Sequence, residues 1–62
     1  MEPIDIYRTA KLLMDQHGTS ARVEAALKAD ACLDKGDLDG AAVWRSVIRA
    51  LGELEAESGT VH

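Results

Sequence analysis

Three side chains of this 62-residue chain are of types that bind transition metals: His17, His62 and Cys32. Tetrahedral metal sites need ligands at short, defined spacings, and no two of these residues stand at such a spacing. His17 lies near the end of a predicted helix, where the helix dipole favours a protonated imidazole. We therefore predict a capping or packing role for His17 and no metal site.

The segment Asp37-Leu38-Asp39-Gly40 has the acidic spacing found inside EF-hand calcium loops. In such a loop the first ligand would be Lys35 and the closing bidentate acid would be Ser46, so the pattern fails at both ends. The two aspartates are better placed to cap the helix that follows and to interact with its dipole. The segment therefore predicts helix capping and not calcium binding.

The sequence contains no arrangement of side chains that predicts an enzyme. It lacks a Ser–His or Cys–His pair with an evident orienting acid, and it has no glycine-rich phosphate loop. Cys32 has no neighbour that would activate its thiol. A chain of this length also has little volume for a pocket. We therefore predict no catalytic residues and no cofactor.

Asp30 is the charged residue that fits its predicted surroundings least well. On a helical wheel it falls near the middle of the apolar face predicted for the second helix. A carboxylate buried there must be paired or hydrogen-bonded. One interpretation is structural. Asp30 is then either a buried polar tether, with Tyr7, His17, the Trp44 indole or an arginine as donor, or an aspartate at the edge of the fold. The other is an acidic site in a groove or interface.

Proline and glycine residues divide the chain into three predicted helices. Pro3 suits a first helical turn because its missing N–H would have no partner there in any case. Gly18 and Gly36 supply left-handed stops after the first and second helices. The predicted helices span about 3–17, 20–35 and 38–57.

Short connections between these helices predict antiparallel neighbours. Thr19 or Ser20 is the predicted N-cap of the second helix. No segment alternates with period two for long enough to form a strand. The predicted fold class is therefore all-α, a compact three-helix bundle that forms one domain over 1–62 with a frayed tail at 58–62.

Helical wheels predict which residues form the core. The apolar arc of the third helix comprises Val43, Trp44, Val47, Ile48, Leu51 and Leu54, opposite Arg45 and Arg49. One face of the first helix comprises Ile6, Tyr7, Ala10, Leu13 and Met14. The predicted apolar side of the second helix comprises Val23, Ala26, Leu27, Ala31 and Leu33.

Charge and composition narrow the classes of partner and the compartment. Seven Lys plus Arg against eleven Asp plus Glu give a net charge of −4, which disfavours nucleic acid and anionic membranes and favours a basic protein surface. The start of the chain lacks the features of a secretion signal, and no apolar run is long enough to span a bilayer. A single cysteine suits a reducing compartment. We therefore predict a cytoplasmic protein.

Leu12, Leu38 and Trp44 form the candidate interface. Leu12 and Leu38 miss the predicted apolar faces, and Trp44 lies at the edge of its arc, where it can close the core or anchor a partner. A core in a chain this short supplies only about 3–5 kcal/mol, so self-association is a natural way to cover such residues. We therefore expect a small interaction or adaptor module that forms a homodimer. Alternatives are an anti-CRISPR-like inhibitor encoded by a phage or mobile element, and a small DNA-binding regulator.

Four parts of the sequence carry a resemblance to a known family. They are Ala29-Asp30-Ala31, Gly36-Asp37-Leu38-Asp39-Gly40-Ala41-Ala42-Val43-Trp44 with Ile48, Ala10-Lys11-Leu12-Leu13 and His17-Gly18. These parts resemble a family of short uncharacterised alphaproteobacterial proteins. The resemblance implies a bacterial cytosolic origin and no catalytic residues, and it assigns no activity.

Overall fold

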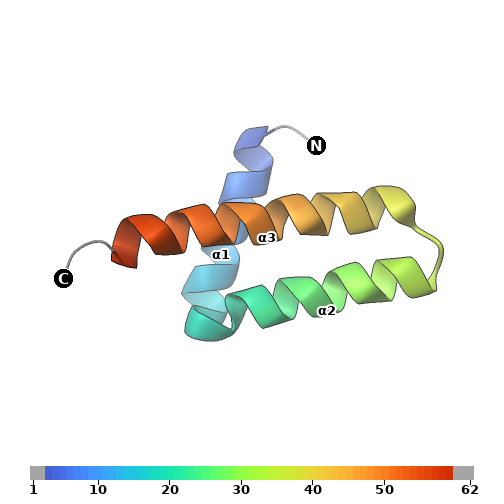
Figure 1. Cartoon of the computed structure of the whole chain (residues 1–62), viewed down its shortest axis with the longest axis horizontal. Coiled ribbons are helices and arrows are strands. Elements are labelled where there is room, and N and C mark those ends of the chain that lie inside the picture. Colours follow the sequence, from blue (N-terminus) through green and yellow to red (C-terminus); the bar gives the residue numbers. More distant parts are fainter. Residues whose placement is uncertain (1–2, 60–62) are drawn as a thin grey trace.

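The computed structural model describes the backbone of residues 3–59 and the side chains of residues 4–56. The described chain is entirely helical apart from the loop between the last two helices (Figure 1). The helices are α1 (Pro3–His17), the short 3₁₀ helix η1 (Gly18–Ser20), α2 (Ala21–Asp34) and α3 (Leu38–Gly59). The predicted all-helical class is thus confirmed for this part of the chain, and the predicted bounds agree within two residues. Because α3 continues to Gly59, only residues 60–62 of the predicted tail, including His62, lie outside the described residues.

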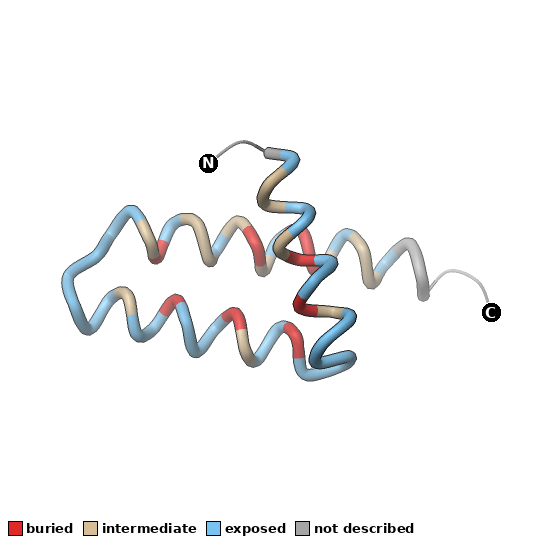
Figure 2. Tube along the Cα trace, turned by 180° about the vertical axis from the view of Figure 1, so that it is seen from behind, coloured by how far each residue is buried: buried red, intermediate tan, exposed pale blue. Residues whose placement is uncertain are grey.

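The helices α2 and α3 run antiparallel and side by side, whereas α1 crosses behind α3 in Figure 1. The view from behind in Figure 2 shows the same crossing. The prediction of antiparallel neighbours therefore holds for α2 and α3 but is wrong for α1. The chain turns sharply after α1 because Gly18, the first residue of η1, has a φ of +56°.

The predicted side-chain cap of α2 is also wrong. Ser20 occupies the N-cap position but makes no side-chain capping hydrogen bond. Its backbone, with φ −88° and ψ 0°, continues the 3₁₀ turn instead of taking the extended conformation typical of a capping serine. The backbone N–H of Ala21 donates to the Gly18 carbonyl within this turn. Backbone bonding therefore replaces the cap.

The loop between α2 and α3 forms as predicted. Gly36 has a φ of +76°, and its N–H donates to the Leu33 carbonyl at 3.0 Å. The Asp37 N–H donates to the Cys32 carbonyl at 2.8 Å, so both bonds close the end of α2. Asp37 then caps α3, because its Oδ1 accepts a hydrogen bond from the Gly40 N–H at 2.9 Å.

The side chains of Asp37 and Cys32 closely approach Gly40. A Cβ atom added there would lie 2.8 Å from Asp37 Cγ and 2.9 Å from Cys32 Sγ. Gly40→Ala must therefore displace the capping side chain, and we expect a net loss of about 1 kcal/mol in the free energy of unfolding, measured by urea denaturation.

Gly52→Ala is the matched control, because a Cβ there would meet only Arg22 Nη2, at 4.0 Å. Alanine suits a helix interior better than glycine, so this variant should gain about 0.5–1 kcal/mol. The interpretation of the Gly40 contact fails if Gly40→Ala stabilises the protein as much as Gly52→Ala does.

The core is built mainly from small side chains. The residues that are at least nine-tenths buried are Ala10, Leu13, Ala21, Ala25, Ala29, Ala41, Val47, Ala50 and Leu51. Because most of these are alanines, the helices can approach closely but bury little apolar surface per residue. Figure 2 shows these buried positions as short segments on the facing sides of the helices.

The structure corrects the predicted apolar side of α2. Its buried face is the alanine face of Ala21, Ala25 and Ala29, with alanines one helical turn apart. The predicted side is exposed: Val23, Ala26, Leu27, Ala31 and Leu33. The facing helix α3 supplies the bulk, so the side of α2 that packs against it must be small.

The faces predicted for the other two helices are largely confirmed. In α1, Ala10 and Leu13 are buried and Ile6 and Met14 pack against the core, whereas Tyr7 remains 43% exposed. In α3, Val47 and Leu51 are fully buried, and Val43, Trp44, Ile48 and Leu54 are half-buried around them. Arg45 and Arg49 are exposed, as predicted.

Candidate interaction surface

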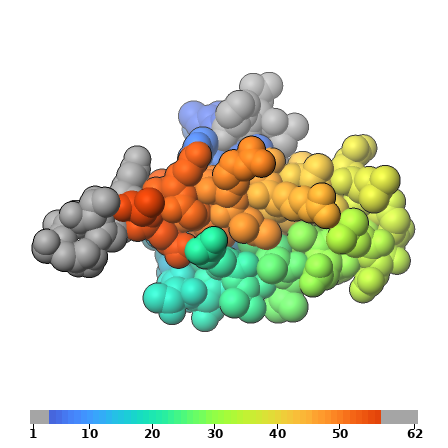
Figure 3. Space-filling view, viewed as in Figure 1, coloured from blue at the N-terminus to red at the C-terminus, as the bar shows by residue number. Residues whose placement is uncertain are grey.

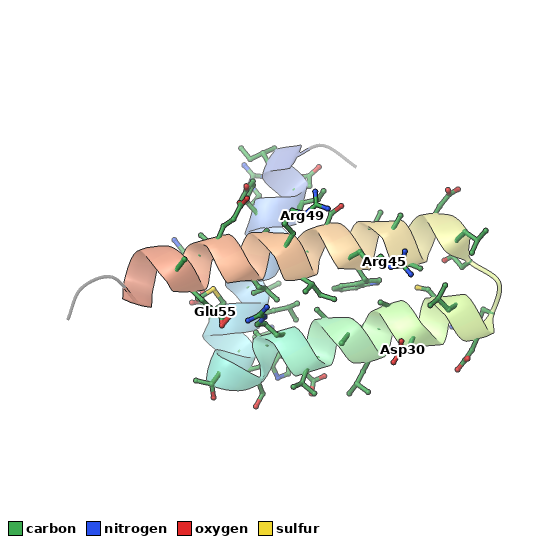
Figure 4. The ribbon with its side chains drawn as sticks, viewed as in Figure 1. Asp30, Arg45, Arg49 and Glu55 are labelled. Atoms are coloured by element: carbon green, nitrogen blue, oxygen red, sulfur yellow. The ribbon has the colours of Figure 1, made fainter. Side chains whose placement is uncertain are left out.

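Asp30, Tyr7 and His17 do not form the predicted buried tether. All three are exposed, and no polar or charged residue among the described side chains is buried. Figure 4 shows Asp30 on the side of α2 that faces away from α3. The prediction is wrong because it took the outer side of α2 for its core side. Asp30 therefore belongs to the surface.

Among the described residues, polar contacts between helices join side chains that are far apart in sequence. The Tyr7 hydroxyl donates to Glu53 Oε2 and thereby links α1 to α3. The Lys28 Nζ lies 5.5 Å from the centre of the Trp44 ring, a cation–π contact between α2 and α3. The sequence does not predict these pairs, because nothing in it indicates which distant residues become neighbours.

Another contact joins Arg22 of α2 to Glu55 of α3. Figure 4 shows Glu55 near the start of α2. Arg22 Nε lies 3.6 Å from Glu55 Oε1, close enough for an ion pair but too far for a good hydrogen bond. Both side chains are substantially exposed, so solvent screens the attraction and the pair contributes little to stability.

A shallow hollow of about 140 Å³ lies between α1 and α3. Its lining comprises Ile6, Tyr7, Ser46, Arg49, Ala50 and Glu53. Pockets for small molecules are typically about 300–1,000 Å³ and enclose most of the ligand. This hollow is too small to enclose such a ligand.

The described residues contain no group of three or more His, Cys, Asp or Glu side chains placed to hold a metal ion. Cys32 is a half-buried free cysteine near the loop between α2 and α3, and Asp37 is engaged as a helix cap. Within the same residues, no helix is both long and apolar enough to cross a membrane.

Several large apolar side chains remain exposed on the described surface. They are Ile4, Tyr7, Leu12, Val23, Leu27, Leu33 and Leu38. Of the candidate interface residues, Leu38 is 71% exposed and Leu12 is 55% exposed, whereas Trp44 is half-buried. The exposure of both leucines follows from their wheel positions, and their role in an interface stays a prediction.

The exposed sides of α2 and α3 carry similar patterns of residues. The α2 stripe consists of Val23, Leu27, Asp30 and Asp34, and it lies opposite the alanine face. The α3 stripe consists of Leu38, Ala42, Arg45 and Arg49. All eight side chains are exposed. Figure 3 shows how these two helices lie together along one face of the molecule, over most of its length.

Comparison of this chain with family models, with curated proteins and with solved structures finds no match. The resemblance to short alphaproteobacterial proteins therefore stays a prediction.

Proposed function

We propose that this chain is a small protein–protein interaction or adaptor module that self-associates, with a homodimer as its smallest assembly, and that it is not an enzyme. The observation that carries the proposal is the contrast between a core built mainly of alanines and an outer surface that exposes leucine and valine. Val23, Leu27 and Leu38 are each more than half exposed. Exposed apolar side chains of this size, on α2 and at the start of α3, can be covered by a protein partner.

Burial of these side chains would contribute strongly to association. Full burial of one leucine or valine is worth about 1.5–3 kcal/mol, which is large beside the roughly 3–5 kcal/mol that a core of this size supplies. Binding to the folded state also raises its stability by mass action. The folded state of a bound copy is therefore more stable than that of a free copy.

The proposal places the protein in the bacterial cytoplasm. The free thiol of Cys32 suits a reducing compartment, and the resemblance to alphaproteobacterial proteins favours the same origin. The net charge of −4 favours a protein partner over nucleic acid. No observation specifically favours an inhibitor of the anti-CRISPR type or a DNA-binding regulator.

Sedimentation velocity over a wide range of protein concentrations tests the proposal. We expect the weight-average sedimentation coefficient to rise with concentration. The triple variant Val23→Gln/Leu27→Gln/Leu38→Gln removes exposed apolar surface without touching the core, so it should stay folded and sediment as a monomer.

Lys11→Gln/Asp15→Gln serves as the control, because both residues are exposed on α1 and neither is apolar. This variant should associate like the wild-type chain. A wild-type chain that remains monomeric at the highest concentration would contradict self-association.

A further inference from the structure

The α2 stripe and the α3 stripe have the same order of residue types with opposite charges. Each begins with two apolar residues and ends with two charged residues, at spacings of i, i+4, i+7 and i+11. Alternating steps of four and three residues place side chains along one seam of a helix, as in coiled coils. The α2 stripe ends in Asp30 and Asp34, and the α3 stripe ends in Arg45 and Arg49.

These charged side chains are not used within the chain. In the part of the chain that the structure describes, none of these two aspartates and two arginines has an ion-pair partner. The ion pair found there joins Arg22 to Glu55. The two helices meet instead through the alanine face of α2. Both stripes therefore remain available to a second molecule.

We propose that the α2 stripe of one copy packs on the α3 stripe of a second copy, with the two helices parallel. The inference rests on the proposed self-association and specifies its surface. The facing pairs are then Val23–Leu38, Leu27–Ala42, Asp30–Arg45 and Asp34–Arg49. Apolar residues meet apolar residues, and each carboxylate meets a guanidinium.

An antiparallel arrangement fits less well. It also pairs the two aspartates with the two arginines, but Leu27 then faces Gly52 and Val23 faces Ala56. Leu38, the most exposed of the large apolar side chains, would have no counterpart on α2. Only the parallel arrangement covers it.

The pairing is head to tail, because the two stripes are different surfaces of the same chain. A dimer formed this way leaves one α2 stripe and one α3 stripe free, so assembly continues with concentration unless it closes into a ring. Each contact involves a single helix from each copy and charges that stay near solvent. We therefore expect weak association that weakens further as salt is added.

Two charge-reversal variants test the pairing. Asp30→Arg/Asp34→Arg makes both stripes basic, and Arg45→Glu/Arg49→Glu makes both acidic. Each variant alone should self-associate at least about tenfold more weakly than the wild-type chain, because like charges then face each other. An equimolar mixture should restore association, because every basic stripe then finds an acidic one. The readout is sedimentation velocity, and circular dichroism verifies that each variant is folded.

Arg8→Glu/Lys11→Glu is the matched control. Both residues are exposed on α1, outside the stripes, and the change in net charge equals that of Arg45→Glu/Arg49→Glu. This control should associate clearly better than Arg45→Glu/Arg49→Glu. The comparison separates the effect of local charge pairing from that of general charge repulsion.

The outcomes distinguish the two proposals. If the wild-type chain associates and the charge-reversed variants associate equally well alone, the stripe pairing is overturned and the interaction module stands. If the mixture fails to regain association, or if the wild-type chain stops at a dimer, the head-to-tail pairing is likewise overturned. If neither the wild-type chain nor the mixture associates at any concentration, both proposals fail.

Discussion

Replacing Leu51 by alanine is expected to remove most of the free energy of unfolding of this protein. Leu51 is fully buried, and with Val47 it is the largest side chain that the fold encloses completely. Truncation of a buried leucine to alanine costs about 2–5 kcal/mol, because apolar burial is lost and a cavity remains. A core of this size supplies only about 3–5 kcal/mol in total. A single deletion therefore removes most of the stability.

Urea denaturation followed by far-ultraviolet circular dichroism measures this effect. The protein concentration must be low, so that self-association does not add to the measured stability. Leu38→Ala is the matched control, because Leu38 is 71% exposed and its truncation should change the free energy of unfolding by no more than about 0.5 kcal/mol. Equal unfolding midpoints for Leu51→Ala and the wild-type chain would show that Leu51 is not part of the core.

Ala25→Leu is expected to destabilise the protein by about 1–3 kcal/mol, the usual range for an overpacked core. Ala25 is fully buried in the alanine face of α2, where α3 supplies the bulky side chains. A leucine there must push the two helices apart or adopt a strained rotamer. The result would show that small side chains set the separation of α2 and α3.

Ala26→Leu distinguishes the observed face of α2 from the one that we predicted from sequence. Ala26 is exposed although it is the next residue along the helix, and leucine is nearly as good a helix former as alanine. The thermal unfolding midpoint of Ala26→Leu should match that of the wild-type chain, whereas the midpoint of Ala25→Leu should be lower. A lower midpoint for Ala26→Leu than for Ala25→Leu would support the predicted face of α2 and contradict the observed packing.

The elements of this fold could be predicted because their signals are local. Gly18 and Gly36 both adopt positive φ at helix ends, and Asp37 caps the helix that it precedes. Each of these features depends on a few neighbouring residues and on the backbone preferences of one residue type. The bounds of all three helices follow from such signals. The buried faces of α1 and α3 follow from the spacing of the apolar residues within each helix.

The buried face of α2 could not be predicted from hydrophobicity, because Val23 and Leu27 are more apolar than the alanines that are buried. Which side of α2 faces inward depends on the bulk that α3 presents, and this is a property of the pair of helices. The same error placed Asp30 in the core. It also concealed the α2 stripe, because three of its four residues, Val23, Leu27 and Asp30, were assigned to the core side.

The candidate surface could be predicted only where a residue missed every predicted face, as Leu12 and Leu38 do. The contacts between helices could not be predicted, since Tyr7 and Glu53 are separated by most of the chain. The crossing of α1 depends on the turn at Gly18 and on these distant contacts. Spacing along one helix contains no information about either.

The positions of the two aromatic residues have a spectroscopic consequence. Tyr7 is the only tyrosine and Trp44 the only tryptophan. Tyr7 lies at the contact of α1 with α3, and Trp44 lies beside Lys28 at the contact of α2 with α3. The α1–α3 interface and the α2–α3 interface thus each have their own intrinsic fluorophore. Fluorescence of the unlabelled chain can therefore report whether α1 detaches first or the whole fold melts in one step.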